Sequence, residues 1–280
     1  MISAFPKTII DGAKGIRKLL LCLLEPFDYA SRIINGKNDF PPLYLRRYVG
    51  PLRTFESSGA EFKVYIKLIG EINNQAKILD LGCGCGLMAL FLSDYLEADG
   101  EYFGLELSRS CIKWCKNNFR TRKNYHFFHI DVKNNIFNPK GKYSAENYVF
   151  DFKDESFDFI LLKSVFTHMT SEGVNNYLKE ISRLLSKRGR ALITFFLLNE
   201  KQRILEQNSL NKILFRHGEG ESKYRYKHSP ESAIAYKEEY IAGLLERNRL
   251  IIRKPIYYGS WSGRDDGISY QDMILIERSQ

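Results

Sequence analysis

Short apolar runs alternate with segments of helical periodicity from about residue 56 to the end of the chain. This alternation is typical of βαβ units, in which parallel strands form one sheet and helices cover its faces. The predicted strands are 77–81, 102–106, 125–130, 157–162, 190–198, 250–256 and 273–276. The pattern therefore predicts an α/β domain built around a mostly parallel sheet.

Helices are predicted between these strands from apolar stripes and from residues that commonly cap helix N-termini. Ser57 and Ser58 precede one such stripe, Ser108 precedes a second, and Thr170 precedes a third. The predicted helices span 62–69, 87–96, 109–117, 171–185 and 231–247.

The first 55 residues are interpreted as a basic N-terminal extension ahead of a domain that spans 56–280. Residues 1–53 hold nine Lys or Arg and four Asp or Glu, and so carry +5 of the net charge of +9. Such a segment is suited to nucleic acid, anionic lipid or an acidic substrate, or serves solubility alone. Within it, 14–27 is predicted to form a short amphipathic helix, docked on the domain or in peripheral contact with a membrane surface.

The apolar run 19–24 bears on localisation because it is much shorter than the roughly 20 residues of a membrane span. No cleavage site of the signal-peptide kind accompanies it. The hydrophobic share of 44% and the charged share of 27% are ordinary for soluble globular proteins. We therefore expect a soluble, cytoplasmic protein.

Residues 199–230 interrupt the alternation of strands and helices. They are polar and contain seven Lys or Arg against four Asp or Glu. An insertion after a strand, at the carboxyl edge of the sheet, is a candidate lid over a substrate. The alternative is a peripheral surface insertion.

Five cysteines occur, and their number and spacing match neither a disulfide framework nor a known zinc pattern. Cys83 and Cys85 stand between glycines, and Cys111 and Cys115 follow in a predicted helix. Reduced thiols without a bound metal are the preferred interpretation.

The most informative motif is the glycine-rich stretch 80–86, Asp-Leu-Gly-Cys-Gly-Cys-Gly, between a predicted strand and helix. Ligands of open α/β sheets bind at this edge, and glycines allow the backbone to approach them closely. Glu106 follows Gly86 by 20 residues, at the end of the next strand, where a carboxylate can accept from ribose hydroxyls.

The charge of the loop distinguishes two classes of cofactor. A dinucleotide brings a pyrophosphate to the helix N-terminus, and Asp80 would be an unfavourable neighbour for it. S-adenosylmethionine instead carries a sulfonium and an ammonium, which Asp80 suits. Asp80 also has an alternative role as an acceptor that organises the loop.

Several motifs together resemble those of class I S-adenosylmethionine-dependent methyltransferases. They are 80–86, 104–108, 130–132, 154–158 with 164–169, and the turn 184–190. Lys187 and Arg188 replace the usual Pro-Gly of that turn, which lies away from the cofactor in this family. The resemblance covers about 56–280, and the stretches 40–44 and 258–264 also resemble a bacterial subgroup of undefined substrate.

The resemblance implies a three-layer Rossmann-like sandwich with a seven-stranded, mostly parallel sheet in the order 3-2-1-4-5-7-6 and an antiparallel last strand. It also implies an enzyme that uses S-adenosylmethionine. Glycines would make room for the methionine moiety, Glu106 would hold the ribose and Asp131 the adenine amino group. The implied cofactor-binding residues are Asp80, Gly82, Gly84, Gly86, Glu106, Leu107, Asp131, Val132 and Ser164.

His168 is the candidate general base because it follows the fourth strand on the edge that would face the methyl group. An imidazole near its ordinary pKa suits proton removal at neutral pH. A packed or helix-capping histidine is the alternative. The substrate pocket is expected to include Tyr257, Tyr258, Trp261, Arg264, Asp265 and Asp266, with Tyr236, Glu239 and Tyr240.

The preferred acceptor is a small molecule, a glycan or a lipid-linked compound, methylated on oxygen or nitrogen. A nucleic-acid methyltransferase is an alternative, although the Asp/Asn-Pro-Pro-Tyr/Phe motif of amino-directed enzymes is replaced by 162–165, Leu-Lys-Ser-Val. A cofactor-binding protein without catalysis is a second alternative, because a fold alone does not settle turnover. An NAD-dependent oxidoreductase ranks last.

Overall fold

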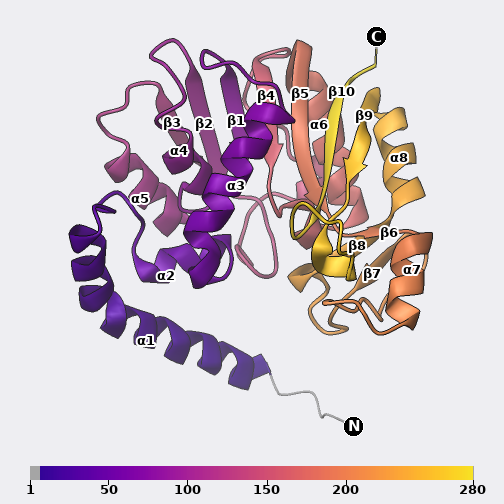
Figure 1. Cartoon of the computed structure of the whole chain (residues 1–280), viewed down its shortest axis with the longest axis horizontal. Coiled ribbons are helices and arrows are strands. Elements are labelled where there is room, and N and C mark those ends of the chain that lie inside the picture. Colours follow the sequence, from indigo (N-terminus) through magenta and orange to yellow (C-terminus); the bar gives the residue numbers. More distant parts are fainter. Residues whose placement is uncertain (1–6, 280) are drawn as a thin grey trace.

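The computed structural model describes residues 7–279, with side chains from residue 19 onward. Its central sheet has seven strands in the order β3-β2-β1-β4-β5-β10-β9 (Figure 1). The strands are β1 Lys77–Leu81, β2 Glu101–Glu106, β3 Tyr125–His129, β4 Phe157–Leu162, β5 Leu185–Phe195, β9 Leu250–Tyr257 and β10 Asp272–Arg278. The last strand, β10, runs antiparallel to both neighbours. The predicted α/β fold, strand order and antiparallel last strand are therefore confirmed.

Helices cover both faces of this sheet and create the three layers. One face is covered by α3 Phe55–Leu68, α4 Leu87–Phe91 and α5 Arg109–Asn118, and the other by α6 Ser171–Leu184 and α8 Glu238–Arg247. Phe159 and Leu161 of β4 belong to the first core, and Ile160 and Leu162 to the second. Because both faces are covered, the central strands are continuous apolar runs rather than alternating ones.

Two of the predicted helix caps are confirmed. Ser108 accepts a hydrogen bond from the Cys111 amide, and Thr170 accepts one from the Gly173 amide. The start of α3 is different, because the helix begins at Phe55 and includes both predicted cap serines in its first turn. The helix predicted for 87–96 ends at Phe91, where Leu92 and Leu96 continue into turns and remain buried.

The prediction of a single helix over 231–247 is wrong in its first part. Residues 234–237 form strand β8, and α8 begins after it. Strand β8 pairs in parallel with β6 Leu197–Leu198 and antiparallel with β7 Ser222–Tyr224, which makes a second, three-stranded sheet. Pairing on both sides satisfies the backbone of β8, and this tertiary contact overrides local helical periodicity.

At the N-terminus, helix α1 Lys7–Ile34 includes the predicted helix 14–27 but is longer than it at both ends. It packs on the short helix α2 Leu43–Arg46, which is followed by single helical turns η1 Arg47–Val49 and η2 Leu52–Thr54. Figure 1 shows α1 extending along one end of the domain. Within residues 7–279, no helix combines the length and apolar character required to cross a bilayer.

The second sheet and the segment before β10 share a small core around Phe196, Phe215 and Trp261. Helix α7 Glu200–Gln207 contacts β6 and the helical turn Ser260–Ser262 beside this core. The buried carboxylate of Asp272 joins this core to the main sheet. It accepts hydrogen bonds at 2.7 Å from the Leu197 and Gly259 amides and from Trp261 Nε1.

Replacing Asp272 with alanine is expected to lower the free energy of unfolding by about 3 kcal/mol or more, because three buried donors lose their acceptor. Chemical denaturation of both proteins measures the change. Asp265→Ala is the matched control, since Asp265 is exposed and should change stability by less than about 0.5 kcal/mol. Equal effects of the two substitutions would contradict this role of Asp272.

Candidate active site

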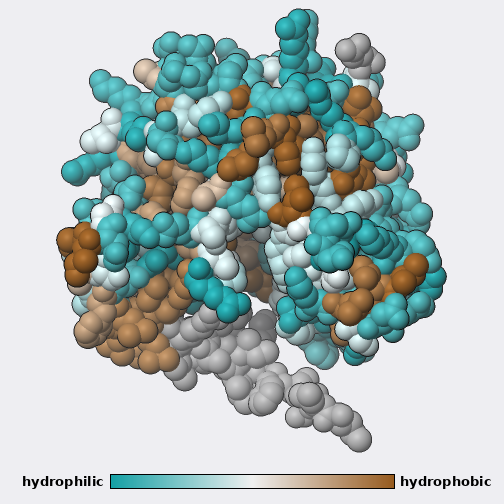
Figure 2. Space-filling model, in the orientation of Figure 1, coloured by the Kyte–Doolittle hydropathy of each residue, from teal (hydrophilic) through white to brown (hydrophobic). Residues whose placement is uncertain are grey.

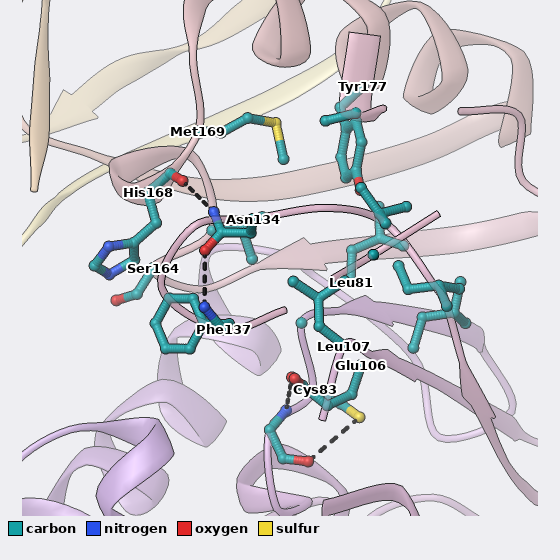
Figure 3. Close-up of a pocket in the computed structure, with 18 of the residues that line it drawn as sticks. Leu81, Cys83, Glu106, Leu107, Asn134, Phe137, Ser164, His168, Met169 and Tyr177 are labelled. Atoms are coloured by element: carbon teal, nitrogen blue, oxygen red, sulfur yellow. Dashed lines mark hydrogen bonds between the residues drawn. The ribbon is translucent and has the colours of Figure 1, made fainter. Parts of the chain in front are cut away.

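A cavity of about 600 Å³ opens at the carboxyl ends of β1, β2 and β4. Its volume lies in the range of small-molecule and cofactor sites. Figure 3 shows Glu106 and Cys83 on one side of it, and Ser164, His168 and Phe137 gathered on another. The predicted site residues that line it are Asp80, Gly82, Gly84, Glu106, Leu107, Val132, Ser164 and His168.

The glycine loop is held against the end of β2 by its own backbone. The amides of Gly82 and Cys83 both donate to the Leu105 carbonyl, at 2.8 and 3.0 Å. Gly82 and Gly84 have positive φ angles of 83° and 55°, which favour glycine. A Cβ on Gly82 would lie 2.6 Å from a Val165 methyl carbon, so a side chain here would have to displace the cavity wall.

The Glu106 carboxylate binds the glycine loop to the end of β2. It accepts hydrogen bonds from the Gly84 amide at 3.0 Å and from the Ser108 amide at 2.8 Å. A carboxylate offers about four lone-pair positions, so acceptor capacity remains on the cavity side. Burial raises the pKa of Glu106, and the two amide donors oppose that shift.

Two further charged groups lie beside the loop. Asp80 is buried and accepts a hydrogen bond from the Tyr102 hydroxyl, and burial raises the pKa of its carboxyl to about 7. Lys163 also lines the cavity, with Nζ 4.7 Å from the centroid of the Phe62 ring. No carboxylate within residues 19–279 forms an ion pair with it. Burial lowers the pKa of Lys163, whereas the nearby negative charge of Asp80 raises it.

Ser164 is held in an unusual backbone conformation beside Lys163, with a φ angle of 60°. Its amide donates to Thr194 Oγ1 at 2.7 Å, and its hydroxyl donates to Gln271 Oε1 at 2.8 Å. A non-glycine residue in this region costs on the order of 1–3 kcal/mol and persists where its surroundings fix it. The bend directs the chain after β4 along the cavity wall.

Gly86 and Asp131 do not line the cavity. A Cβ on Gly86 would lie 3.1 Å from Cys115 Sγ and 3.2 Å from the Phe119 ring, so this glycine permits close packing of α4 on α5. The Asp131 carboxylate accepts from Asn138 Nδ2 at 3.0 Å and so holds the loop that follows β3. Their assignment to the cofactor stays a prediction.

Residues 79–193 match a family model described as "Methyltransferase domain". The matched segment runs from β1 through most of β5 and contains the glycine loop, Glu106, Val132, Ser164 and His168. The matched segment therefore contains most of the residues that form the predicted site.

Solved structures share the fold at low sequence identity. A TehB-like SAM-dependent methyltransferase from Corynebacterium glutamicum is 17% identical, with 86% of this chain and 100% of that chain covered and a TM-score of 0.51. A SAM-dependent methyltransferase from Aquifex aeolicus is 15% identical, with coverages of 85% and 98% and a TM-score of 0.51. The 1,6-didemethyltoxoflavin-N1-methyltransferase of Burkholderia thailandensis is 15% identical, with coverages of 100% and 93% and a TM-score of 0.50.

The family-model match to residues 79–193 and the fold together support a class I S-adenosylmethionine-dependent methyltransferase. The matched segment contains the glycine loop that lines the cavity.

In this methyltransferase, His168 ends the helical turn Phe166–His168 after β4 and is half-buried in the cavity wall. Its Nδ1 lies 2.8 Å from the Glu231 carbonyl oxygen. Because a carbonyl can only accept, Nδ1 carries the hydrogen in this contact. Burial lowers the pKa of His168, so the ring is neutral at pH 7 and Nε2 retains a lone pair.

Sequence analysis missed three residues that hold His168 in place. Asn134 Nδ2 donates to the His168 carbonyl at 2.9 Å, while Asn134 Oδ1 accepts from the Ile136 and Phe137 amides. The Phe137 ring packs edge-on against His168 with centroids 5.3 Å apart (Figure 3). Glu231 contributes its carbonyl, and its carboxylate binds the backbone and side chain of Asn135. An Asn that closes a turn on itself is a detectable signal, but its contact with His168 depends on the tertiary structure.

The N-terminal segment also lines the cavity, which sequence analysis did not predict. Tyr48, Val49 and Gly50 lie against the glycine loop, and a Cβ on Gly84 would lie 2.4 Å from a Val49 methyl carbon. The site therefore includes residues from the predicted extension 1–55 as well as from 56–280. That division into domains stays a prediction.

None of the residues expected in the substrate pocket lines this cavity, and their role in substrate binding stays a prediction; they are Tyr257, Tyr258, Trp261, Arg264, Asp265, Asp266, Tyr236, Glu239 and Tyr240. Trp261 is fully buried in the small core, and Arg264 stacks on the Tyr258 ring at 4.1 Å. Tyr258 in turn donates to Glu238. These side chains satisfy one another, which explains why aromatic and charged residues gather there. None of residues 199–230 lines the cavity either, and their role as a lid stays a prediction.

Four of the five free cysteines lie in the glycine loop and in α5. Cys83, Cys85, Cys111 and Cys115 are buried, whereas Cys22 is exposed. Burial raises the pKa of Cys83, Cys85 and Cys111, in the last case to about 12. Such thiols pack as small apolar groups and are weak nucleophiles.

The imidazole of His168 is expected to titrate below its ordinary pKa of about 6.5 and to carry its hydrogen on Nδ1 at pH 7. Nitrogen-15 NMR of the histidine side chains, recorded across pH 5–8, measures both properties. The His168→Gln variant identifies the resonances. A midpoint above 7 would contradict the lowering of this pKa by burial, and a hydrogen on Nε2 would contradict the contact with the Glu231 carbonyl.

Proposed function

We propose that this methyltransferase binds S-adenosylmethionine in the cavity and transfers the methyl group to an oxygen or nitrogen of its acceptor. The acceptor is a small molecule, a glycan or a lipid-linked compound. The observation that carries the proposal is that one cavity combines the glycine loop, the Glu106 carboxylate and a neutral His168.

The charges of the cavity suit this cofactor. Glu106 has free acceptor capacity for the two ribose hydroxyls, and Asp80 offers a carboxylate to the ammonium and sulfonium groups. Lys163 supplies a positive charge for the methionine carboxylate. Gly82 and Gly84 leave room for the methionine moiety next to the cavity walls.

When bound, S-adenosylmethionine supplies a methyl group that its sulfonium sulfur has already activated. The protein then has to orient the acceptor, exclude water and remove a proton from a hydroxyl or protonated nitrogen. His168 suits proton removal, since its neutral ring has a lone pair on Nε2 and its Nδ1 hydrogen is held by the Glu231 carbonyl. The imidazolium that forms keeps this hydrogen bond.

A small-molecule acceptor has additional support from one structural neighbour. The enzyme from Burkholderia thailandensis is named for methylation of N1 of 1,6-didemethyltoxoflavin and was solved with that compound and S-adenosylhomocysteine bound. It covers 100% of this chain.

Glu106→Ala is expected to weaken the binding of S-adenosylhomocysteine by about tenfold to hundredfold, because hydrogen bonds to a charged group are removed. Isothermal titration calorimetry measures the affinity. The matched control is Glu101→Ala, at the opposite end of β2, which should bind like the wild type. If the wild type fails to bind S-adenosylhomocysteine, the proposed cofactor is wrong.

Binding of S-adenosylhomocysteine, which carries the ammonium group, is expected to strengthen as the pH rises from 6 towards 7. Below about 7 the Asp80 carboxyl is protonated in the free protein, and the ammonium group of the ligand favours its ionised form. Binding therefore releases a proton, and the affinity levels off above pH 7. Calorimetry at pH 6.2 and 7.8 measures the change, which Asp80→Asn should abolish. A pH-independent affinity in the wild type would contradict this role.

A further inference from the structure

Helix α1 turns its charged face towards the protein and its apolar face towards solvent. Leu21, Glu25, Asp28 and Arg32 follow one another at helical spacing and form the inner face. Arg32 donates to Glu25 at 2.6 Å, to Asp28 at 2.8 Å and to the Phe40 carbonyl at 2.7 Å. Arg46 of α2 forms a second ion pair with Asp28.

The opposite face of α1 is apolar and exposed. Leu23 retains 63% of its accessible surface, Phe27 retains 75% and Ile34 retains 82%. Their spacing is that of one helical face. Figure 2 shows hydrophobic surface gathered over this part of α1. The members of the face are Leu19, Leu20, Leu23, Leu24, Phe27 and Ile34.

This arrangement is the reverse of an ordinary surface helix, which buries its apolar stripe against the core. Exposed apolar patches of this kind mark sites of contact with proteins or membranes. The helix cannot cross a bilayer, because it lacks the required apolar length. A helix of this kind lies in the interface of a membrane, with its apolar face among the acyl chains.

The charge of the segment identifies the kind of surface. Glu25 and Asp28 are already paired with Arg32 and Arg46. The preceding turns of the sequence, 7–18, hold four basic residues and one acidic residue. Basic residues next to an apolar helix face attract anionic lipid headgroups. A second copy of the chain would instead bring two basic segments together.

We propose that the apolar face of α1, defined by Leu19, Leu20, Leu23, Leu24, Phe27 and Ile34, binds the surface of an anionic lipid membrane. The helix lies parallel to that surface, and the ion pairs of Arg32 and Arg46 on the inner face of α1 hold the domain to the helix. Membrane binding does not depend on methyl transfer.

The position of α1 has a consequence for the cavity that rests on the proposed function. Helix α1 packs on α2, and the turns directly after α2 supply Tyr48, Val49 and Gly50 to the cavity wall. A membrane-bound α1 holds the cavity close to the lipid surface. Among the acceptor classes above, this arrangement favours a lipid-linked compound.

The test is co-sedimentation of the full chain with vesicles of phosphatidylcholine alone or mixed with phosphatidylglycerol. We expect binding to the mixed vesicles that weakens with added salt, and little binding to phosphatidylcholine alone. The double variant L23S/F27S should lose about tenfold or more in its partition coefficient, because two large side chains no longer enter the lipid.

The matched control is L68S/I204S, which removes two exposed apolar side chains outside α1 and should bind like the wild type. Thermal unfolding followed by circular dichroism checks that both variants are folded. The proposal is overturned if the wild type does not sediment with anionic vesicles, or if both double variants lose binding equally. It is also overturned if light scattering shows a dimer that L23S/F27S dissociates, without vesicle binding, since the face then joins two copies. Binding of S-adenosylhomocysteine, measured separately, shows whether the proposed cofactor or the membrane contact has failed.

Discussion

The parallel pairing of β1 with β2 fixes the distance between the glycine loop and Glu106, and most of the site depends on it. Leu81 is in register with Leu105, and the Leu105 carbonyl accepts from both Gly82 and Cys83. The next amide, that of Gly84, then lies within hydrogen-bonding distance of the Glu106 carboxylate. The cavity therefore begins where a strand pairing ends, as expected for an open α/β sheet. A change in this register would separate the loop from the carboxylate.

Charges around the cavity are arranged so that each is only partly satisfied by the protein. Asp80 is a buried carboxylate and Glu106 a half-buried one, and burial raises the pKa of both. Each has protein donors that do not use its full capacity. Lys163 is a cation in the same wall, stacked on Phe62. Buried charge without a full set of partners is unfavourable for folding, and such groups gather at functional sites. A ligand with one carboxylate and two positively charged groups, such as S-adenosylmethionine, would complete their pairing.

Two elements outside the seven-stranded sheet and its covering helices also contribute to the site: the second sheet and the N-terminal helices. The second sheet brings Glu231 to His168, so a peripheral addition fixes the tautomer of the residue proposed as the base. The N-terminal helices contribute in a different way. Their ion pairs fix α1 by its polar face and leave its apolar face available. The second sheet and the N-terminal helices therefore add contacts to the cavity that lie outside the seven-stranded sheet and the helices that cover it.

The sequence by itself determined the main sheet, the glycine loop and the position of Glu106, because these depend on local patterns. Apolar runs bounded by glycine and a helix cap specify β1, the loop and α5 through contacts between near neighbours in the chain. The same reasoning placed His168 after β4. Gly86 and Asp131 matched the family motif, yet packing of α4 on α5 and the contact with Asn138 account for them in the structure.

The tertiary structure alone decided which distant residues complete the site. Residues 234–237 form a strand because β6 and β7 pair with them, and Glu231 contacts His168 across 63 positions of sequence. The outward orientation of the apolar face of α1 could not be predicted either, since amphipathic periodicity does not reveal which face of a helix is buried. The paired charges of Arg32, Arg46 and Asp28 decided that orientation. Local sequence fixes an element and its periodicity, whereas its partner is fixed by long-range contacts that a single sequence does not encode locally.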